Sequence, residues 1–267
     1  MPELPEVETI VRGLAPRLVG RRIERIEVFQ PRVWRGEAGR ARGFTVTGVQ
    51  RRGKHILLEL RRGSARACLG VHLGMTGQLL WKTPPGRHTR AVLHLHGGDR
   101  VLYNDIRQFG RLELAADLPE RVARLGPDAL RIQQREFLQR FTARRGMIKP
   151  LLLDQAFLSG LGNIYADEAL FRARVHPRAT AAALPPARAA GLFRAMRRVL
   201  AQAIAQGGSS ISDYVGSDGR PGRFQLRHNV YGRTGEPCRV CGASIRRIVV
   251  GGRGTHFCPR CQKPPRG

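Results

Sequence analysis

Lysine is nearly absent from this chain of 267 residues, and acidic residues are scarce. Lys54, Lys82, Lys149 and Lys263 are the only lysines, so almost all of the positive charge belongs to arginine. Only 20 Asp and Glu residues oppose 47 Lys and Arg residues, which gives a net charge of +27. A field of this sign indicates a polyanionic partner, and arginine suits bidentate contact with phosphate. Genome composition or heat adaptation accounts for part of the arginine excess, but not for the net charge.

Long apolar runs are also missing. No segment approaches the roughly twenty apolar residues that a membrane-spanning helix needs, so we expect no membrane partner. The opening from Met1 to Glu6 is acidic and has no apolar stretch, which argues against a secretory signal. Cys68, the one cysteine outside the C-terminal region, lies in an apolar, strand-like segment. These features predict a reducing, cytoplasmic location.

The other four cysteines form two pairs near the C-terminus. Cys238 and Cys241 are three positions apart, as are Cys258 and Cys261, and sixteen residues separate the pairs. Two thiolates at this spacing occupy two corners of a tetrahedron, and a hairpin brings the second pair to the other two corners. The pattern predicts one zinc ion per chain, with the structural role of stapling a small terminal hairpin.

The first half of the chain reads as one helix followed by short strands. Apolar residues from Val7 to Leu18 recur at helical spacing. Strands are then expected at residues 23–29, 44–50, 55–60, 68–73, 91–96 and 101–104. Short strands separated by glycine-rich turns indicate an antiparallel β-sandwich or barrel rather than a parallel sheet.

The second half has helical periodicity. Helices are expected at residues 136–144, 147–158, 163–174 and 186–206, and a glycine- and arginine-rich loop at 216–229. The fold class is therefore α+β with two domains. We expect a domain at residues 1–115 with the helix and the β-sandwich, a linker at 116–134, a helical domain at 135–229 and the zinc-finger hairpin at 230–267.

A glycine-containing turn lies between two of these helices, at residues 158–165. Asn163 is placed to cap the helix that follows. The exposed amides of that helix start would bind an anion, most simply a DNA phosphate. An ordinary corner between two helices fits the same residues equally well.

Several motifs in order carry a family resemblance. The opening Met1-Pro-Glu-Leu-Pro-Glu-Val-Glu8 resembles that of bacterial formamidopyrimidine-DNA glycosylases, which are base-excision repair enzymes for oxidised purines. The likeness continues at residues 72–77, 105–110, 160–168 and 230–233 and in the zinc hairpin. The related endonuclease VIII branch usually opens Pro-Glu-Gly-Pro-Glu, which argues against that branch. The resemblance implies a helix-two-turn-helix in the helical domain.

The resemblance assigns catalytic roles to five residues. Once Met1 is removed, Pro2 is a secondary α-amine that titrates near 8 and attacks C1′ of the damaged nucleotide to form a Schiff base. Glu3 would protonate the sugar ring oxygen, and Glu6 would orient Pro2 or a water; both glutamates also suit the first turn of a helix. Lys54 matches the family's general acid/base lysine. Arg253 matches the arginine of the finger that grips phosphate and assists the last elimination.

Further matches concern DNA. Met75, Arg107 and Phe109 would fill the gap that the extruded base leaves, with Arg107 bonding the orphaned partner base. Ile106 and Gln108 stand where the family commonly carries proline and arginine, which bears on the rigidity of this loop and on opposite-base strictness. The expected phosphate contacts, besides Arg253, are His72, His88, Arg145, Lys149, Asn163 and Tyr231.

The resemblance therefore implies a bifunctional DNA glycosylase and AP lyase in base-excision repair. It would excise 8-oxoguanine and formamidopyrimidines from double-stranded DNA, cut abasic sites by β- and δ-elimination, and act as a monomer at the bacterial nucleoid. An oxidised-pyrimidine glycosylase on the same scaffold is the first alternative. A non-catalytic nucleic-acid-binding protein that uses the zinc hairpin is the second.

Overall fold

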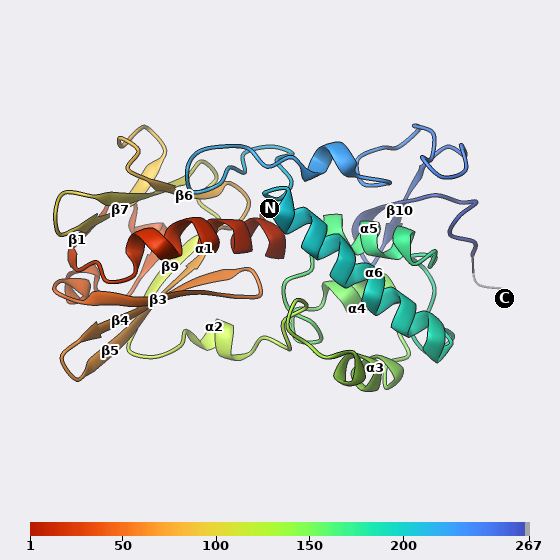
Figure 1. Ribbon diagram of the computed structural model, residues 1–267, viewed down its shortest axis with the longest axis horizontal. Helices are drawn as coiled ribbons and strands as arrows, with labels where there is room; N and C mark the ends of the chain where they lie inside the picture. The colour runs from red at the N-terminus through yellow and green to blue at the C-terminus, as the bar shows by residue number, and fades with distance from the viewer. Residues whose placement is uncertain (265–267) are drawn as a thin grey trace. The chain divides into compact units, whose positions relative to one another are not determined.

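The computed structural model describes residues 1–264 of the chain (Figure 1). Contacts divide the chain into two compact units. The first contains residues 1–124 and Ile204–Gln225, and the second contains Leu125–Ala203 and the residues from Leu226 onward. The segment Ile204–Gln225 thus returns to the first unit after the long helix of the second, so a late part of the chain lies beside the N-terminal helix.

The first unit is built around helix α1 (Leu4–Leu18). Its apolar stripe from Val7 to Leu18 is buried, in agreement with the helical spacing. Glu3 precedes the helix, and its backbone N–H donates to Glu6 Oε2 at 2.8 Å, which satisfies one of the orphan donors of the first turn. The two acidic residues therefore fix the start of the helix.

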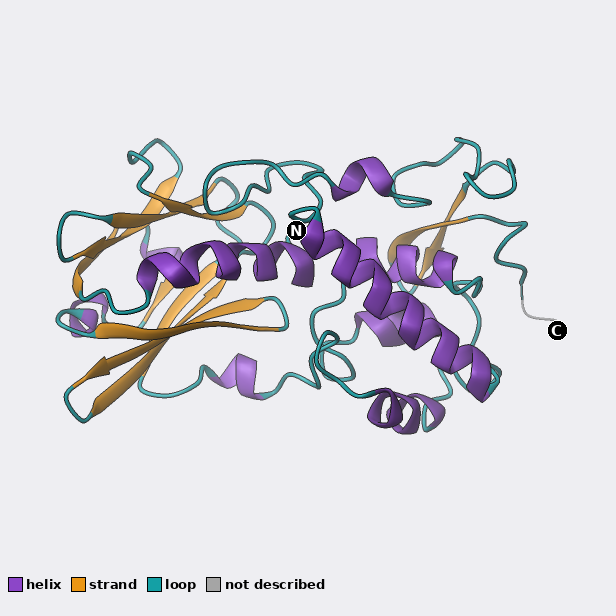
Figure 2. Ribbon diagram, in the orientation of Figure 1, coloured by secondary structure: helices purple, strands orange, loops and turns teal. Residues whose placement is uncertain are grey.

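Two sheets pack with α1 in one core. The first sheet has the order β1-β7-β8-β6 and the second has the order β2-β9-β5-β4-β3. Figure 2 shows these strands gathered around the helix. The strands are β1 (Ile23–Val28), β2 (Trp34–Arg35), β3 (Thr45–Arg52), β4 (His55–Arg62), β5 (Ala65–His72), β6 (Gly77–Trp81), β7 (Thr89–Leu95), β8 (Arg100–Asp105) and β9 (Arg111–Ala115). Ile10, Val46 and Leu93 represent the shared core of the helix and the two sheets.

The predicted α+β fold with a β-sandwich is confirmed, with one local departure. All pairings in the two sheets are antiparallel except that of β2 and β9, which run parallel for two residues. The sequence pattern predicts six of the strands and misses β2, β6 and β9. These three are short, and strands of two to five residues give too few alternations to detect.

The second unit is mainly helical. Its helices are α3 (Gln134–Thr142), α4 (Ile148–Leu153), α5 (Asn163–Arg172) and α6 (Pro186–Ala205), and its hairpin consists of β10 (Arg246–Val250) and β11 (Arg253–Phe257). The helix predicted for residues 147–158 ends early, at Leu153. Asp154 Oδ1 accepts from Ala156 N, and Gln155 Nε2 donates to the carbonyl of Leu153. Side chains that bond the local backbone compete with the helix and end it.

Four short elements complete the described chain. Helix α2 (Glu120–Ala123) lies within the interval expected to link the domains, and Val122 is buried. Two 3-10 turns, η1 (Pro31–Val33) and η2 (Ala38–Ala41), lie between β1 and β3, and a third, η3 (Phe224–Arg227), precedes the zinc hairpin. None of the helices within residues 1–264 combines the length and the apolar character needed to cross a bilayer.

Candidate active site and nucleic-acid interface

The N-terminal turn brings three predicted catalytic residues together. Pro2 is buried, and Glu3 and Glu6 are 3% and 1% exposed, whereas Met1 is 50% exposed. The Glu6 carboxylate accepts from Glu3 N at 2.8 Å through Oε2 and from Ser209 N at 2.7 Å through Oε1. One buried carboxylate therefore holds both the backbone next to Pro2 and a residue of the returning segment.

The returning segment packs closely against this turn. Tyr214 is buried, and its hydroxyl donates to the carbonyl of Gly207 at 3.0 Å and lies 3.3 Å from the carbonyl of Glu6. Gly208 has a φ of +83°, and a Cβ there would lie 2.8 Å from Glu6 Oε1. Sequence reasoning missed Ser209 and Tyr214. In the sequence, the adjacent glycines at 207 and 208 indicate only the end of a helix.

Lys54 lies in the turn between β3 and β4 and is 8% exposed. It follows Gly53, which has a φ of +57°. Arg51, at the end of β3, donates from Nη1 to the carbonyl of Gly53 at 3.0 Å and from Nε to Glu8 Oε2 of α1 at 2.8 Å. The turn that carries Lys54 is thus connected to the helix that begins just after Pro2.

His72 lies at the end of β5 beside His55. The two imidazole rings are 4.7 Å apart. Burial, then the charges of Lys54 and Arg121, lowers the pKa of His72 to about 4, and burial with the neighbouring His72 lowers the pKa of His55 to about 3. His72 Nδ1 accepts from Gly74 N at 3.2 Å, so the proton of the neutral ring is on Nε2. At neutral pH His72 is therefore an uncharged hydrogen-bond donor rather than a cation.

The three predicted gap-filling residues lie on two loops that touch. Met75 is 39% exposed and Phe109 is 50% exposed, and the guanidinium of Arg107 lies 4.7 Å from the centre of the Phe109 ring. A Cβ on Gly74 would come within 2.5 Å of Gly110 N, so the two backbones are in direct contact. The loops therefore present apolar and cationic groups on a common support.

Asp105 holds this support together. Its buried carboxylate accepts from Tyr103 Oη at 2.9 Å, from Gly110 N at 2.8 Å and from Thr76 Oγ1. Thr76 Oγ1 in turn accepts from Arg107 N at 2.9 Å. Burial and the nearby Asp105 raise the pKa of Tyr103, so its hydroxyl stays a donor. Asp105 was part of a quoted motif, but sequence reasoning gave it no role.

Gln108 and His88 border the same loops. Gln108 has a φ of +56°, a left-handed conformation that β-carbon-bearing residues adopt only rarely. The carbonyl of His88 accepts from Asp105 N at 3.0 Å, and the side chain of His88 is partly buried. The structure thus places His88 next to the gap-filling loops, with its backbone fixing the end of β8.

In the second unit, two predicted DNA contacts converge on one carbonyl group. Gly254 O accepts from Lys149 Nζ at 3.1 Å and from Asn163 Nδ2 at 2.9 Å. Gly254 follows Arg253, which is exposed at the turn of the zinc hairpin. Lys149 and Asn163 thus help to hold β11 at the point where Arg253 projects.

One expectation about these residues needs correction, and the burial of a second residue is now visible. Asn163 is not the N-cap of α5; Gly162 is, and the Asn163 side chain is turned to the hairpin instead. Lys149 is fully buried, and its ammonium also contacts Thr255 Oγ1 at 2.7 Å and Asp167 Oδ1 at 2.6 Å. Its three donors are therefore directed at protein atoms in this conformation.

Two adjacent acidic residues of α5 organise this region, and sequence reasoning gave neither a role. Asp167 Oδ2 accepts from His256 N at 2.8 Å, which holds β11. Glu168 is fully buried and accepts from the backbone N–H groups of residues 229, 230 and 231 at 2.9–3.0 Å. The Tyr231 ring is thereby placed 5.0 Å from that of His256. The available signal was two adjacent acids in a helix whose other residues from Ile164 to Phe171 are apolar or aromatic.

Arg145 completes the predicted DNA contacts of the second unit. It is exposed in the segment between α3 and α4. The predicted residues therefore fall into two sets, each assembled within its own unit. Pro2, Glu3, Glu6, Lys54, His72, Met75, His88, Arg107 and Phe109 lie in the first, and Arg145, Lys149, Asn163, Tyr231 and Arg253 lie in the second.

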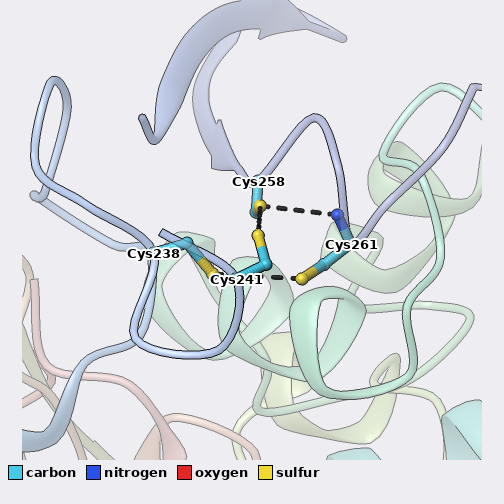
Figure 3. Close-up of side chains that lie close together, drawn as sticks. All are labelled: Cys238, Cys241, Cys258 and Cys261. Carbon is cyan, nitrogen blue, oxygen red and sulfur yellow. Dashed lines mark hydrogen bonds between the residues drawn. The ribbon is translucent and has the colours of Figure 1, made fainter. Parts of the chain in front are cut away.

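The four C-terminal cysteines form one cluster (Figure 3). Their Sγ atoms all lie within 4.8 Å of one another. Cys241 and Cys258 are 3.4 Å apart, and Cys238 and Cys261 are 3.9 Å apart. Zinc–sulfur bonds of ~2.3 Å place the ligands of a tetrahedral ion ~3.8 Å apart. The donor set and its spacing thus fit a zinc ion.

Both cysteine pairs have the backbone geometry of metal knuckles. Val240 N donates to Cys238 Sγ at 3.4 Å, and Cys261 N donates to Cys258 Sγ at 3.4 Å. Such bonds stabilise thiolates, which are the form that binds metal. Bound zinc would supply four bonds that hold the base of the hairpin, which is too small to be stable alone.

Comparison with known protein families covers almost the whole chain. Residues 1–112 match the model of the formamidopyrimidine-DNA glycosylase N-terminal domain, and residues 125–215 match that of the formamidopyrimidine-DNA glycosylase H2TH domain. Residues 235–264 match a zinc finger found in FPG and IleRS. The chain belongs to the formamidopyrimidine-DNA glycosylase family.

Individual relatives agree with the family. The formamidopyrimidine-DNA glycosylase of Solibacter usitatus is 50% identical over 98% of this chain and all of its own length. The crystal structure of the MutM (Fpg) protein of Thermus thermophilus superposes with a TM-score of 0.89 at 44% identity, covering 99% of this chain and 100% of that one. The structure of a Lactococcus lactis Fpg variant in complex with Fapy-dG DNA superposes with a TM-score of 0.88 at 36% identity. The match covers 98% of this chain and 100% of that one.

These findings confirm the resemblance stated from the motifs. The two-domain α+β fold and the C-terminal zinc finger are those of the family. The chain is thus an enzyme of this family, and its predicted assignment to DNA-repair glycosylases is confirmed.

Proposed function

We propose that this glycosylase excises oxidised purines, 8-oxoguanine and formamidopyrimidines, from double-stranded DNA and then cleaves the abasic strand. The observation that carries the proposal is the N-terminal turn, where Pro2 adjoins two buried carboxyl groups and Glu6 fixes the neighbouring backbone. The Fapy-dG DNA bound by the Lactococcus lactis relative supports the substrate class.

The reaction begins with a free amine. Removal of the exposed Met1 converts Pro2 into a secondary amine with a pKa near 8 in model compounds, so a useful fraction is unprotonated at neutral pH. The amine attacks C1′, the base leaves, and Glu3 protonates the ring oxygen as the sugar opens. The resulting iminium withdraws electrons from the sugar and permits β- and then δ-elimination of the two phosphates, and Lys54 acts as general acid and base both in base excision and in the eliminations.

The second unit would grip DNA. Arg253 is exposed at the hairpin turn and suits phosphate contact. Lys149 and Asn163 act indirectly in this scheme, because their donors hold Gly254 next to Arg253. Zinc in the four-cysteine site keeps the hairpin folded. The enzyme would act as a monomer on nucleoid DNA in the cytoplasm.

Borohydride trapping tests the proposal. We expect the protein to form a covalent adduct with an abasic duplex and the same-turn control Pro5→Ala to keep it, whereas Pro2→Gly, which has a primary amine in place of the secondary one, should excise the damaged base much more slowly. Excision assays should show 8-oxoguanine and formamidopyrimidine cut much faster than thymine glycol. Intact-mass analysis should show Met1 removed. Full base excision by Pro2→Gly would refute the nucleophile, and faster cutting of thymine glycol would favour the pyrimidine branch.

A further inference from the structure

Arg51 is a guanidinium buried in the first unit, at the end of β3. Its side chain is 2% exposed. Guanidinium stays charged at all physiological pH values, and burying a charge is strongly unfavourable unless it is paired and hydrogen-bonded. Its partners are therefore part of what makes this position stable.

The partners of Arg51 come from two different elements. Nε lies 2.8 Å from Glu8 Oε2 on α1, and Nη1 lies 3.0 Å from the carbonyl of Gly53 in the β3–β4 turn. The other carboxylate oxygen of Glu8 pairs with Arg12, which is 63% exposed. Burial raises the pKa of Glu8, but the hydrogen bonds from Arg51 and Arg12 outweigh it and hold that pKa below its ordinary value. The anion is thus the stable form.

The carbonyl that Arg51 binds belongs to the peptide between Gly53 and Lys54. The hydrogen bond to this carbonyl fixes the orientation of the peptide plane that precedes the Lys54 Cα. Gly53 adopts a φ of +57°, so the turn is tight, and Lys54 is largely buried. A guanidinium has a rigid fork of donors that can bond two acceptors at once, whereas an ammonium is a compact point charge.

The β4–β5 turn provides a natural comparison. Arg61 Nε donates to the carbonyl of Gly63 at 3.0 Å, and Gly63 has a φ of +59°. Arg61 is exposed. The arginine-to-glycine hydrogen bond is therefore a common feature of such turns. What distinguishes Arg51 is its second bond, to the helix that begins next to Pro2.

We propose that Arg51 is a positioning residue, which through Glu8 holds the Lys54 turn in register with the catalytic start of α1. The inference rests on the proposed function, because it gives Lys54 a role in base excision. Arg51 acts through Lys54 and touches no substrate. Misplacing a catalytic group by about 1 Å lowers rates by about 100-fold.

A double-mutant cycle tests this link. Single-turnover rates of 8-oxoguanine excision are measured for Arg51→Met, Lys54→Ala and the double variant. We expect Arg51→Met to lower the rate by about 10- to 100-fold, and the double variant to match Lys54→Ala within about threefold. Rates that fall in the double variant by the product of the two single effects would show that Arg51 does not act through Lys54, and would overturn the proposal.

Matched control variants distinguish the loss of the Glu8–Arg51–Lys54 connection from a general effect of removing an arginine. Arg61→Met removes the same kind of turn bond, and Arg12→Met removes the exposed partner of Glu8. Both should keep the rate within about threefold of wild type. Arg51→Lys keeps the positive charge but loses the forked guanidinium donors, so its excision rate should fall as far as that of Arg51→Met. A drop in either control equal to that of Arg51→Met, or a wild-type rate for Arg51→Lys, would contradict the proposal.

Two further measurements keep the outcome clear. If Arg51→Met does not fold, as judged by its thermal unfolding transition, the same cycle is run with Glu8→Gln, which leaves an uncharged acceptor at the helix. Borohydride trapping of the wild-type protein on abasic DNA reports on the proposed function separately. No adduct means that the proposed function fails, whereas an adduct with additive cycle energies means that only the positioning role fails.

Discussion

The ammonium of Lys149 and the carboxylate of Asp167 form an ion pair at 2.6 Å in which both side chains are fully buried. Removing one member leaves the other charge buried without compensation. We therefore expect Lys149→Met to lower the free energy of unfolding of the second unit by about 3–5 kcal/mol. Urea unfolding followed by circular dichroism measures the change.

The exposed pair of Glu120 and Arg124 is the control. Its side chains are 75% and 78% exposed, so Glu120→Gln should change stability by less than about 1 kcal/mol. The double variant Lys149→Met with Asp167→Asn should recover part of the loss, because no unpaired charge remains. A loss for Lys149→Met as small as that for Glu120→Gln would mean that the buried pair does not support the unit.

The metal site makes a separate prediction. Cys258 is fully buried in the four-cysteine cluster, and replacing its thiolate removes one of four bonds to zinc. We expect Cys258→Ser to reduce bound zinc from about one per chain to near zero and to weaken DNA binding, because the hairpin that carries Arg253 loses its base. Elemental analysis and a binding titration measure the two effects. Cys68→Ser, at a buried cysteine outside the cluster, should retain zinc, and retention of both properties by Cys258→Ser would refute a zinc-dependent hairpin.

Local pattern predicted the elements of this protein well where one rule dominated. The stripe from Val7 to Leu18 predicted α1, and the spacing of the two cysteine pairs predicted the four-cysteine cluster, because each signal lies within a short segment of the chain. The predicted end of α4 was wrong, because the side chains of Asp154 and Gln155 form hydrogen bonds with nearby backbone groups and end the helix. Helical spacing continues past this point and conceals the competing bonds.

The supporting residues of the site were beyond sequence reasoning. Glu6 meets Ser209, and Arg51 meets Glu8, through contacts between segments far apart in the chain. Asp105 and Glu168 lay inside recognised motifs, but their roles depend on backbone N–H groups that only the fold brings near. Lys149 shows a different limit, because a match to the family predicts its DNA contact but nothing in the sequence indicates that the fold buries its charge.

The gap-filling loops contain two apolar side chains of nearly equal exposure, which allows a test of the wedge role. Phe109 is 50% exposed and Ile106 is 49% exposed, and both belong to one loop. Only Phe109 stacks with Arg107. Loss of an aromatic stacking partner for bases is worth about 1–3 kcal/mol, so Phe109→Ala should slow excision from duplex DNA by about 5- to 150-fold, whereas Ile106→Ala should stay within about threefold. Equal effects in single-turnover assays would argue against a wedge role for Phe109.

The neighbouring histidines His55 and His72 predict how stability depends on pH. Burial lowers their pKa values from 6.5 to about 3 and about 4. Above pH 6.5 both are neutral in the folded and unfolded chains and contribute nothing. Below it the unfolded chain binds protons that the folded chain excludes, so the free energy of unfolding falls as the pH drops toward 4, by up to about 1.4 kcal/mol per pH unit for each histidine.

Urea unfolding of the first unit at pH 7, 6 and 5 measures this slope. The range stays above 4.5, the ordinary pKa of Glu8, whose lowered value in the fold removes stability only at more acidic pH. His55→Gln removes one of the two titrating groups and should roughly halve the slope between pH 6 and 5, because His72 remains. His96→Gln, at an exposed histidine, should leave the slope as in wild type. An unchanged slope in His55→Gln would mean that His55 is protonated in the folded protein, and that burial does not keep it neutral.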